Sequence, residues 1–158
     1  MLELKNIHKF YNPGTVNEMC LFENFNLSVP TGQFVSVVGS NGSGKTSLLN
    51  LICGSIDLDG GQVLIDGKDI AKQKEYQRQK YMGRVYQNPA MGTCPQMTIL
   101  ENMSLADNKG KFFGLKRGTE KARIEFYREN LRQLGLGLED KLDIKVGSLS
   151  GGQRQAMA

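Results

Sequence analysis

The eight residues from Gly39 to Thr46 have the types and spacing that bind a phosphate group. They fit the pattern G-x-x-x-x-G-K-[ST], in which glycines let backbone N–H groups approach a triphosphate closely. Lys45 would contact the β- and γ-phosphates, and the Thr46 hydroxyl would bind Mg²⁺. The alternative is a glycine-rich turn with an incidental lysine. The residues predicted to bind the nucleotide here are Gly39, Ser40, Asn41, Gly42, Ser43, Gly44, Lys45, Thr46 and Ser47.

The sequence on either side of this loop predicts the elements that would hold it in place. Residues 34–38 are mostly apolar and rich in β-branched side chains, which predicts a short buried strand. Apolar residues at helical spacing follow over 48–52, and Gly54 is a favoured helix end. A helix that begins at the loop points unpaired N–H groups and its positive dipole end at an anion. The strand, loop and helix together favour the phosphate site over the incidental turn.

Other segments predict a mixture of strands and helices. Strands are expected over 2–11, 21–29, 62–67 and 83–87, and helices over 70–81, 98–103 and 119–134, with a loop over 108–118. Thr98 and Glu101 have the spacing of a capping box. Asp66 ends an apolar run, and an aspartate at the end of such a run can bind the Mg²⁺ that accompanies a phosphate loop. Gly67 follows it without an adjacent carboxylate, so a tight turn is the favoured interpretation.

Length, composition and charge are those of one globular domain. The chain has 158 residues and a net charge of +4, which arises from a basic surplus over 107–132. A solvated helix face is favoured over a nucleic-acid patch for that run. Cys20, Cys53 and Cys94 lack the spacing of zinc ligands, which predicts reduced thiols in a cytosolic compartment. We find no signal-peptide pattern and no run of 18 apolar residues, so a membrane role would require a partner.

A second turn of small residues, Leu149-Ser150-Gly151-Gly152-Gln153, narrows the possibilities. It resembles the signature motif of the ABC-type ATPases, the ATP-binding subunits of ABC transporters, and the family pattern continues into Arg154 and Gln155. Tyr11 occupies the place of the aromatic residue that stacks on adenine in that family. Gln87 matches the family's Q-loop glutamine. The resemblance extends over residues 2–158, with these motifs in the family's order.

The resemblance implies an α/β fold of the P-loop NTPase type. This fold has a RecA-like core, an antiparallel β subdomain and a helical subdomain, and the C-terminal part of the core would be missing here. The implied divisions are 1–95 for the β subdomain and P-loop core, 96–148 for the helical subdomain, and 149–158 for the signature and the start of its helix.

The resemblance also implies ATP and Mg²⁺ as ligands, with Lys45 and Gln87 as catalytic residues. Gln87 would contact the metal and the attacking water. Two copies would pair head to tail, so that Ser150, Gly151, Gly152 and Gln153 of each copy cap the γ-phosphate held by the other. A separate membrane-spanning permease would hold the chain at the inner face of the cell membrane. The alternatives are a packed aromatic at Tyr11, an exposed strand-end residue at Gln87, and a simple helix-capping loop at 150–152.

The family pattern continues beyond the signature with an apolar strand ending in Asp-Glu and a switch histidine. The chain ends at Ala158, and His8 matches no family motif. We therefore expect ATP binding without a complete hydrolytic site, and poor folding of the chain alone because 34–38 would lack its sheet neighbours. Two other functions stay open: a non-transport ABC ATPase in DNA repair or on the ribosome, and an ATP-binding module without turnover. The sequence does not indicate the transported solute.

Overall fold

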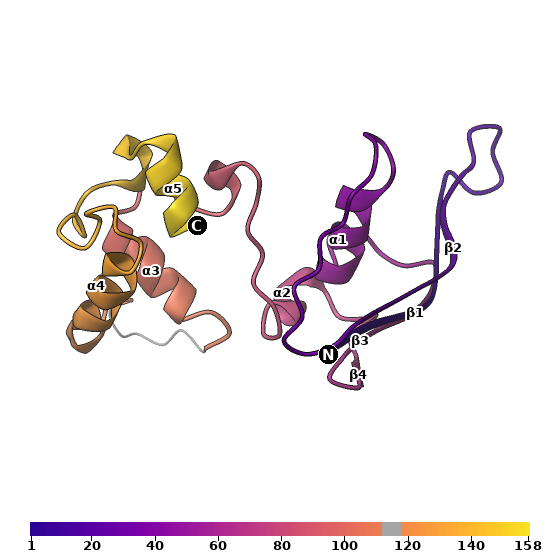
Figure 1. Cartoon of the computed structure of the whole chain (residues 1–158), viewed down its shortest axis with the longest axis horizontal. Coiled ribbons are helices and arrows are strands. Elements are labelled where there is room, and N and C mark those ends of the chain that lie inside the picture. The colour runs from indigo at the N-terminus through magenta and orange to yellow at the C-terminus, as the bar shows by residue number, and fades with distance from the viewer. Residues whose placement is uncertain (112–117) are drawn as a thin grey trace. The chain divides into compact units, whose positions relative to one another are not determined.

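The computed structural model describes residues 1–111 and 118–158, which form two compact units, Met1–Met82 and Gly83–Ala158. Figure 1 shows the elements of both. The predicted division into 1–95, 96–148 and 149–158 stays a prediction. The predicted loop over 108–118 lies partly outside the described residues, at 112–117. Within the described part of the chain, no helix combines the length and the apolar character that a membrane span requires.

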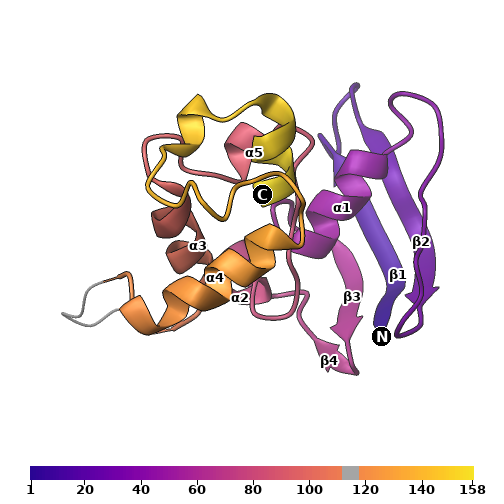
Figure 2. The ribbon, with the colours of Figure 1, turned by 60° about the vertical axis from the view of Figure 1, so that its left-hand side comes forward.

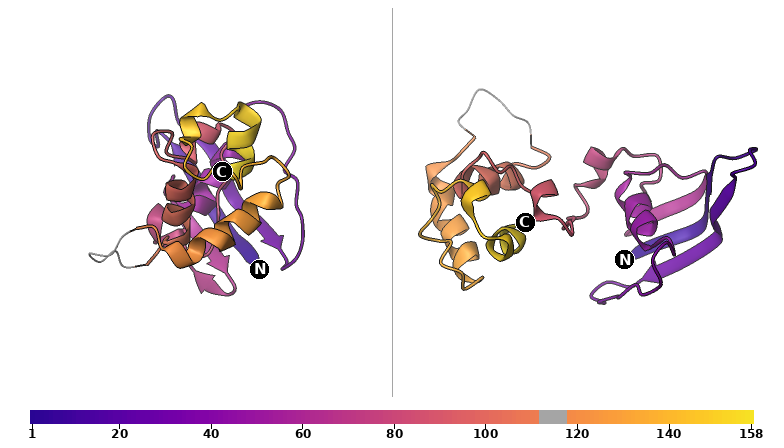
Figure 3. Two further views of the ribbon diagram at one scale, coloured as in Figure 1. Left: turned by 90° about the vertical axis from the view of Figure 1, so that its left-hand side faces the viewer. Right: turned by 90° about the horizontal axis from the view of Figure 1, so that it is seen from above.

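The first unit is an antiparallel sheet with a helix on one face. The strands are β1 (Leu2–Tyr11), β2 (Met19–Val29), β3 (Gly60–Ile65) and β4 (Lys68–Asp69), in the order β2-β1-β3-β4. Helix α1 (Lys45–Cys53) lies against this sheet (Figures 2 and 3), and the short helix α2 spans Glu75–Arg78. The core residues are Leu4, Ile7, Leu48, Leu51, Val63 and Ile70. The antiparallel β subdomain expected from the sequence is therefore present.

The second unit is helical. It contains α3 (Ile99–Asp107), α4 (Ile124–Arg132) and α5 (Gly151–Met157), with 3-10 turns at Pro89–Met91, Lys121–Arg123 and Val146–Ser148. The predicted capping box at the start of α3 is confirmed: Thr98 Oγ1 accepts from the Glu101 amide at 3.2 Å, and Glu101 accepts from the Thr98 amide at 2.7 Å. Residues 142–146 bond to the start of α3, and the core residues are Ile99, Leu131, Leu138, Leu142, Val146 and Leu149.

Two predicted strands are wrong. Residues 34–38 and 83–87 have no regular secondary structure, and Phe34 and Val38 are 95% and 87% exposed. The reason is that a strand exists only by pairing its backbone with a neighbour. No segment of the described chain supplies that neighbour for either run. The predicted helix over 70–81 is also too long, because only Glu75–Arg78 is helical, whereas Asp66 lies in the expected turn with a φ of 48°.

Candidate nucleotide-binding site

The predicted phosphate loop wraps around its own lysine. Lys45 Nζ donates hydrogen bonds to the carbonyl oxygens of Gly39 at 2.8 Å and Ser40 at 2.7 Å. It also lies 3.4 Å from Ser43 Oγ. Gly44, which precedes α1, has a φ of 86°, a left-handed backbone conformation that residues other than glycine rarely adopt. The loop therefore places the ammonium group on its concave side, at the start of the helix.

The start of α1 is suited to an anion. Within the described residues no side chain caps this helix, and its first turn contains no acidic residue. The first backbone N–H groups of a helix lack intrahelical partners, and the helix dipole adds positive potential there. A Cβ atom on Gly39 would lie 2.7 Å from Ser43 Oγ, so a side chain at that position would displace the Ser43 hydroxyl. Thr46, in the first turn, is exposed. These features fit a phosphate group with a metal ion at the Thr46 hydroxyl.

Tyr11 lies at the end of β1, close to the strand that contacts the phosphate loop. Tyr11 pairs with Met19 of β2. Between the partners of Lys9 and Phe10 the register shifts, leaving Leu21 as an extra residue in β2. A Cβ atom on Gly44 would lie 3.1 Å from Leu21 Cδ1, so this bulge rests against the loop. The strand that pairs with Tyr11 is therefore also the strand that contacts the predicted phosphate loop.

Ser150 of the signature turn caps helix α5, as expected if residues 150–152 form a simple helix-capping loop. Ser150 Oγ accepts from the Gln153 amide at 3.2 Å, and the Ser150 amide donates to Gln153 Oε1 at 3.3 Å. Capping uses Ser150 Oγ only as an acceptor, so its hydroxyl proton can still be donated to another group. Among the described residues, Cβ atoms on Gly151 and Gly152 would meet nothing within 4 Å. The packing of this part of the chain therefore does not require glycine at either position.

Gln87 is exposed and lies beside the helix of the signature turn. The neighbouring Tyr86 carbonyl accepts a hydrogen bond from Gln155 Nε2 of α5 at 3.3 Å, and Asn88 Oδ1 accepts from the Ala90 amide at 3.0 Å. The contact between Tyr86 and Gln155 joins residues 69 positions apart, and no spacing in the sequence indicates it. Tyr11 and Lys45 belong to the first compact unit, whereas Gln87 and Ser150 belong to the second.

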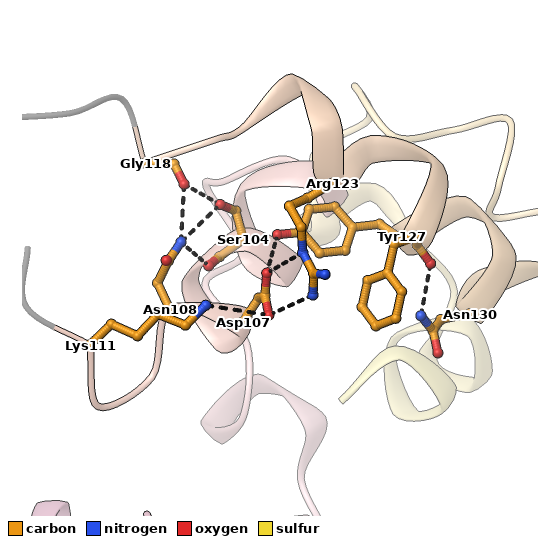
Figure 4. Close-up of polar contacts among 9 residues, drawn as sticks. Ser104, Asp107, Asn108, Lys111, Gly118, Arg123, Tyr127 and Asn130 are labelled. Carbon is orange, nitrogen blue, oxygen red and sulfur yellow. Dashed lines mark hydrogen bonds and ion pairs between the residues drawn. The ribbon is translucent and has the colours of Figure 1, made fainter.

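In the second unit, some basic residues of the run over 107–132 pair with acidic side chains in a charged cluster (Figure 4). Asp107 accepts from Arg123 Nε and Nη2, both at 2.9 Å, and from the Tyr127 hydroxyl at 2.9 Å. The Arg123 hydrogen bonds, followed by that of Tyr127, hold the pKa of Asp107 below its ordinary value. Burial raises the pKa of Tyr127. Arg128 and Arg132 also pair with acids on α4, so these three arginines are engaged within the unit.

Comparison with known proteins gives one consistent result. A family model described as ABC transporter matches residues 22–158. The chain is 45% identical to a tyrosine transport ATP-binding protein from Clostridioides difficile (strain R20291), over the whole chain and 62% of that relative. It is 35% identical to the spermidine/putrescine import ATP-binding protein PotA from Haemophilus influenzae (strain 86-028NP), over the whole chain and 38% of that relative. The chain therefore spans less than two thirds of either relative's length.

A solved structure has the same fold. It is a dimeric post-hydrolysis state of the ATP-binding cassette MJ0796, bound to ADP and Pi. Its TM-score to this chain is 0.76 at 32% sequence identity, and the alignment covers 99% of this chain and 67% of that one. This likeness agrees with the P-loop NTPase fold expected from the sequence.

Proposed function

This chain belongs to the ABC transporter family. On that premise, we propose that it forms the nucleotide-binding part of a transporter's ATP-binding subunit. ATP binding and hydrolysis by the subunit would drive solute movement through a separate membrane-spanning partner. The relatives described above are named for tyrosine transport and for spermidine/putrescine import, which supports small-solute transport as the process served. The peripheral position at the membrane follows from that partner and is part of the same proposal.

The observation that carries the proposal is the phosphate loop with Lys45 inside it. The ammonium group, the left-handed Gly44 and the uncapped start of α1 all face one small region. In the proposed complex Lys45 exchanges its bonds to Gly39 and Ser40 for bonds to the β- and γ-phosphates, while loop amides bind the remaining oxygens. Thr46 would be a ligand of Mg²⁺, and Gln87 is the second metal ligand that the family resemblance assigns. The metal would neutralise phosphate charge, and Tyr11 would stack on the base.

The signature turn supports pairing of two copies. Ser150 has a hydroxyl proton to donate, and Gly151 and Gly152 leave open space beside the start of α5. Glycines that the packing of the described residues does not require are expected where an external group approaches the backbone closely. We place the γ-phosphate held by a second copy there, with Gln153 completing the turn. The dimeric state of the related cassette supports this arrangement.

Nucleotide affinity tests the phosphate site. Lys45→Ala should weaken binding of the Mg²⁺ complex of a non-hydrolysable ATP analogue by about 10- to 100-fold, because a hydrogen bond from a charged donor contributes about 1.5–3 kcal/mol. Lys72→Ala, an exposed lysine of the same unit, is the matched control and should bind like the wild type. Equal affinities for all three proteins, measured by calorimetry, would overturn the phosphate site.

Oligomeric state tests the signature turn. Ser150→Arg places a bulky cation where the partner's nucleotide would lie, so light scattering should find less ATP-dependent dimer than for the wild type. Ser28→Arg, on the exposed side of β2, is the control and should pair normally. ATP-dependent dimers at wild-type levels in Ser150→Arg would remove the signature turn from the interface while leaving the Lys45 site intact.

A further inference from the structure

The end of β1 carries a lysine whose ammonium group lies over the ring of Tyr11. Lys9 Nζ is 5.6 Å from the centre of the Tyr11 ring, within the range of a cation–π interaction. The Lys9 side chain is only 12% exposed, so its position is set by its neighbours rather than by solvent. One face of the Tyr11 ring is thereby in contact with a cation, and a planar ligand is left with the other face.

Asp59 fixes this lysine from the turn before β3. Lys9 Nζ lies 3.1 Å from Asp59 Oδ1, and Asp59 Oδ2 accepts from the Phe10 amide at 2.7 Å. The Asp59 amide in turn donates to the His8 carbonyl at 3.1 Å. The hydrogen bond from Phe10 is the main cause of the lowered pKa of Asp59, which keeps the carboxylate charged. A chain of contacts therefore runs from the backbone of β1 through Asp59 and Lys9 to the Tyr11 ring.

We propose that Lys9, held by Asp59, is a positioning residue that orders the Tyr11 ring for stacking with the nucleotide base. This inference rests on the proposed function, because it assigns the base that Tyr11 would contact. A surface aromatic ring that is already ordered loses less side-chain entropy when a ligand stacks on it. Ordering one side chain costs about 0.5–1.5 kcal/mol, so Lys9 should strengthen the contribution of the base by about two- to tenfold.

The experiment separates the base from the phosphates. Calorimetry gives dissociation constants for the Mg²⁺ complexes of AMP-PNP, which has the base, and of inorganic tripolyphosphate, which lacks it. Lys9→Met keeps the aliphatic chain and removes the charge, and should lower the preference for AMP-PNP over tripolyphosphate by about two- to tenfold. Tripolyphosphate affinity itself should not change. Lys9→Arg should keep the wild-type preference for AMP-PNP over tripolyphosphate, because a guanidinium can also stack on an aromatic ring.

A matched control lies on the same strand. Lys5 pairs with Glu3 at 3.3 Å, as Lys9 pairs with Asp59, and it lies six residues before Tyr11 in the sequence. Lys5→Met should leave the preference for AMP-PNP unchanged. If Lys9→Met does not fold, Asp59→Asn gives the same test, because its side-chain oxygen can still accept from the Phe10 amide while the ion pair with Lys9 is lost.

The possible results separate the role of Lys9, the stacking role of Tyr11 and the phosphate site. A wild-type preference in Lys9→Met, combined with a lowered preference in Tyr11→Ala, would overturn the role of Lys9 and keep the stacking role of Tyr11. A wild-type preference in both variants would overturn the base contact, and the inference with it, while tripolyphosphate binding that depends on Lys45 would keep the phosphate site. Absence of binding to either probe would overturn the proposed function itself.

Discussion

Replacement of Arg78 by methionine should destabilise the first unit strongly. Arg78 is 1% exposed, and its guanidinium donates to four backbone carbonyl oxygens. Two of them, at the end of α1, belong to Leu51 at 2.7 Å and Ile52 at 3.0 Å. The others belong to Ala71 at 2.7 Å and Gln73 at 2.9 Å. One side chain thus ties the end of the phosphate-loop helix to the segment after β4.

The magnitude follows from these four contacts. The bond to Leu51 is buried and has a charged donor, so losing it costs about 1.5–3 kcal/mol, although the Gly54 amide still donates to the Leu51 carbonyl at 3.3 Å. The other three bonds are partly buried, so water can replace the donor and each costs about 0.5–1 kcal/mol. Burial lowers the pKa of Arg78, which means that burying this charge itself carries a cost that methionine avoids. The expected net loss is about 3 kcal/mol.

Urea denaturation followed by circular dichroism measures this loss. Arg128→Met is the control, because Arg128 is exposed on α4 and its pair with Glu125, at 3.4 Å, contributes about 0.5 kcal/mol or less. A loss below about 1 kcal/mol for Arg78→Met, similar to the control, would show that the four carbonyl contacts do not stabilise the unit as argued.

Three further predictions concern the loop, a helix cap and a charged cluster. Gly44→Ala should cost about 1–2 kcal/mol and weaken nucleotide binding, because Gly44 has a φ of 86°; an unchanged melting temperature would contradict this. Thr98→Ala should cost about 1 kcal/mol through loss of the cap on α3, and Thr98→Ser should recover most of it in the same urea assay. The pKa of Asp107 is lowered from 3.8, so its stabilising contribution is complete above pH 3.8 and is lost as the pH falls through the lower folded-state value. The difference in melting temperature between the wild type and Asp107→Asn should therefore shrink below pH 3.8, and a constant difference down to pH 2 would refute it.

Local patterns in the sequence were sufficient where neighbouring residues decide the structure. Strand β1 covers the predicted residues 2–11, and the capping box of Thr98 and Glu101 forms as its spacing indicates. The motif around Lys45 gave the loop and the start of α1. The strand predicted over 34–38 does not form, because its apolar pattern says nothing about a pairing partner; only the family resemblance indicated that its sheet neighbours would be missing.

The sequence alone determined the chemistry that this protein can offer: a lysine in a glycine-rich loop, a serine–glycine turn, and the family to which both belong. The tertiary structure decided which groups meet. The Leu21 bulge against Gly44, Asp59 beside Lys9, and Arg78 at the end of α1 join residues far apart in sequence. Such contacts depend on strand register and on burial, which arise only when the whole unit packs, so short-range spacing cannot indicate them.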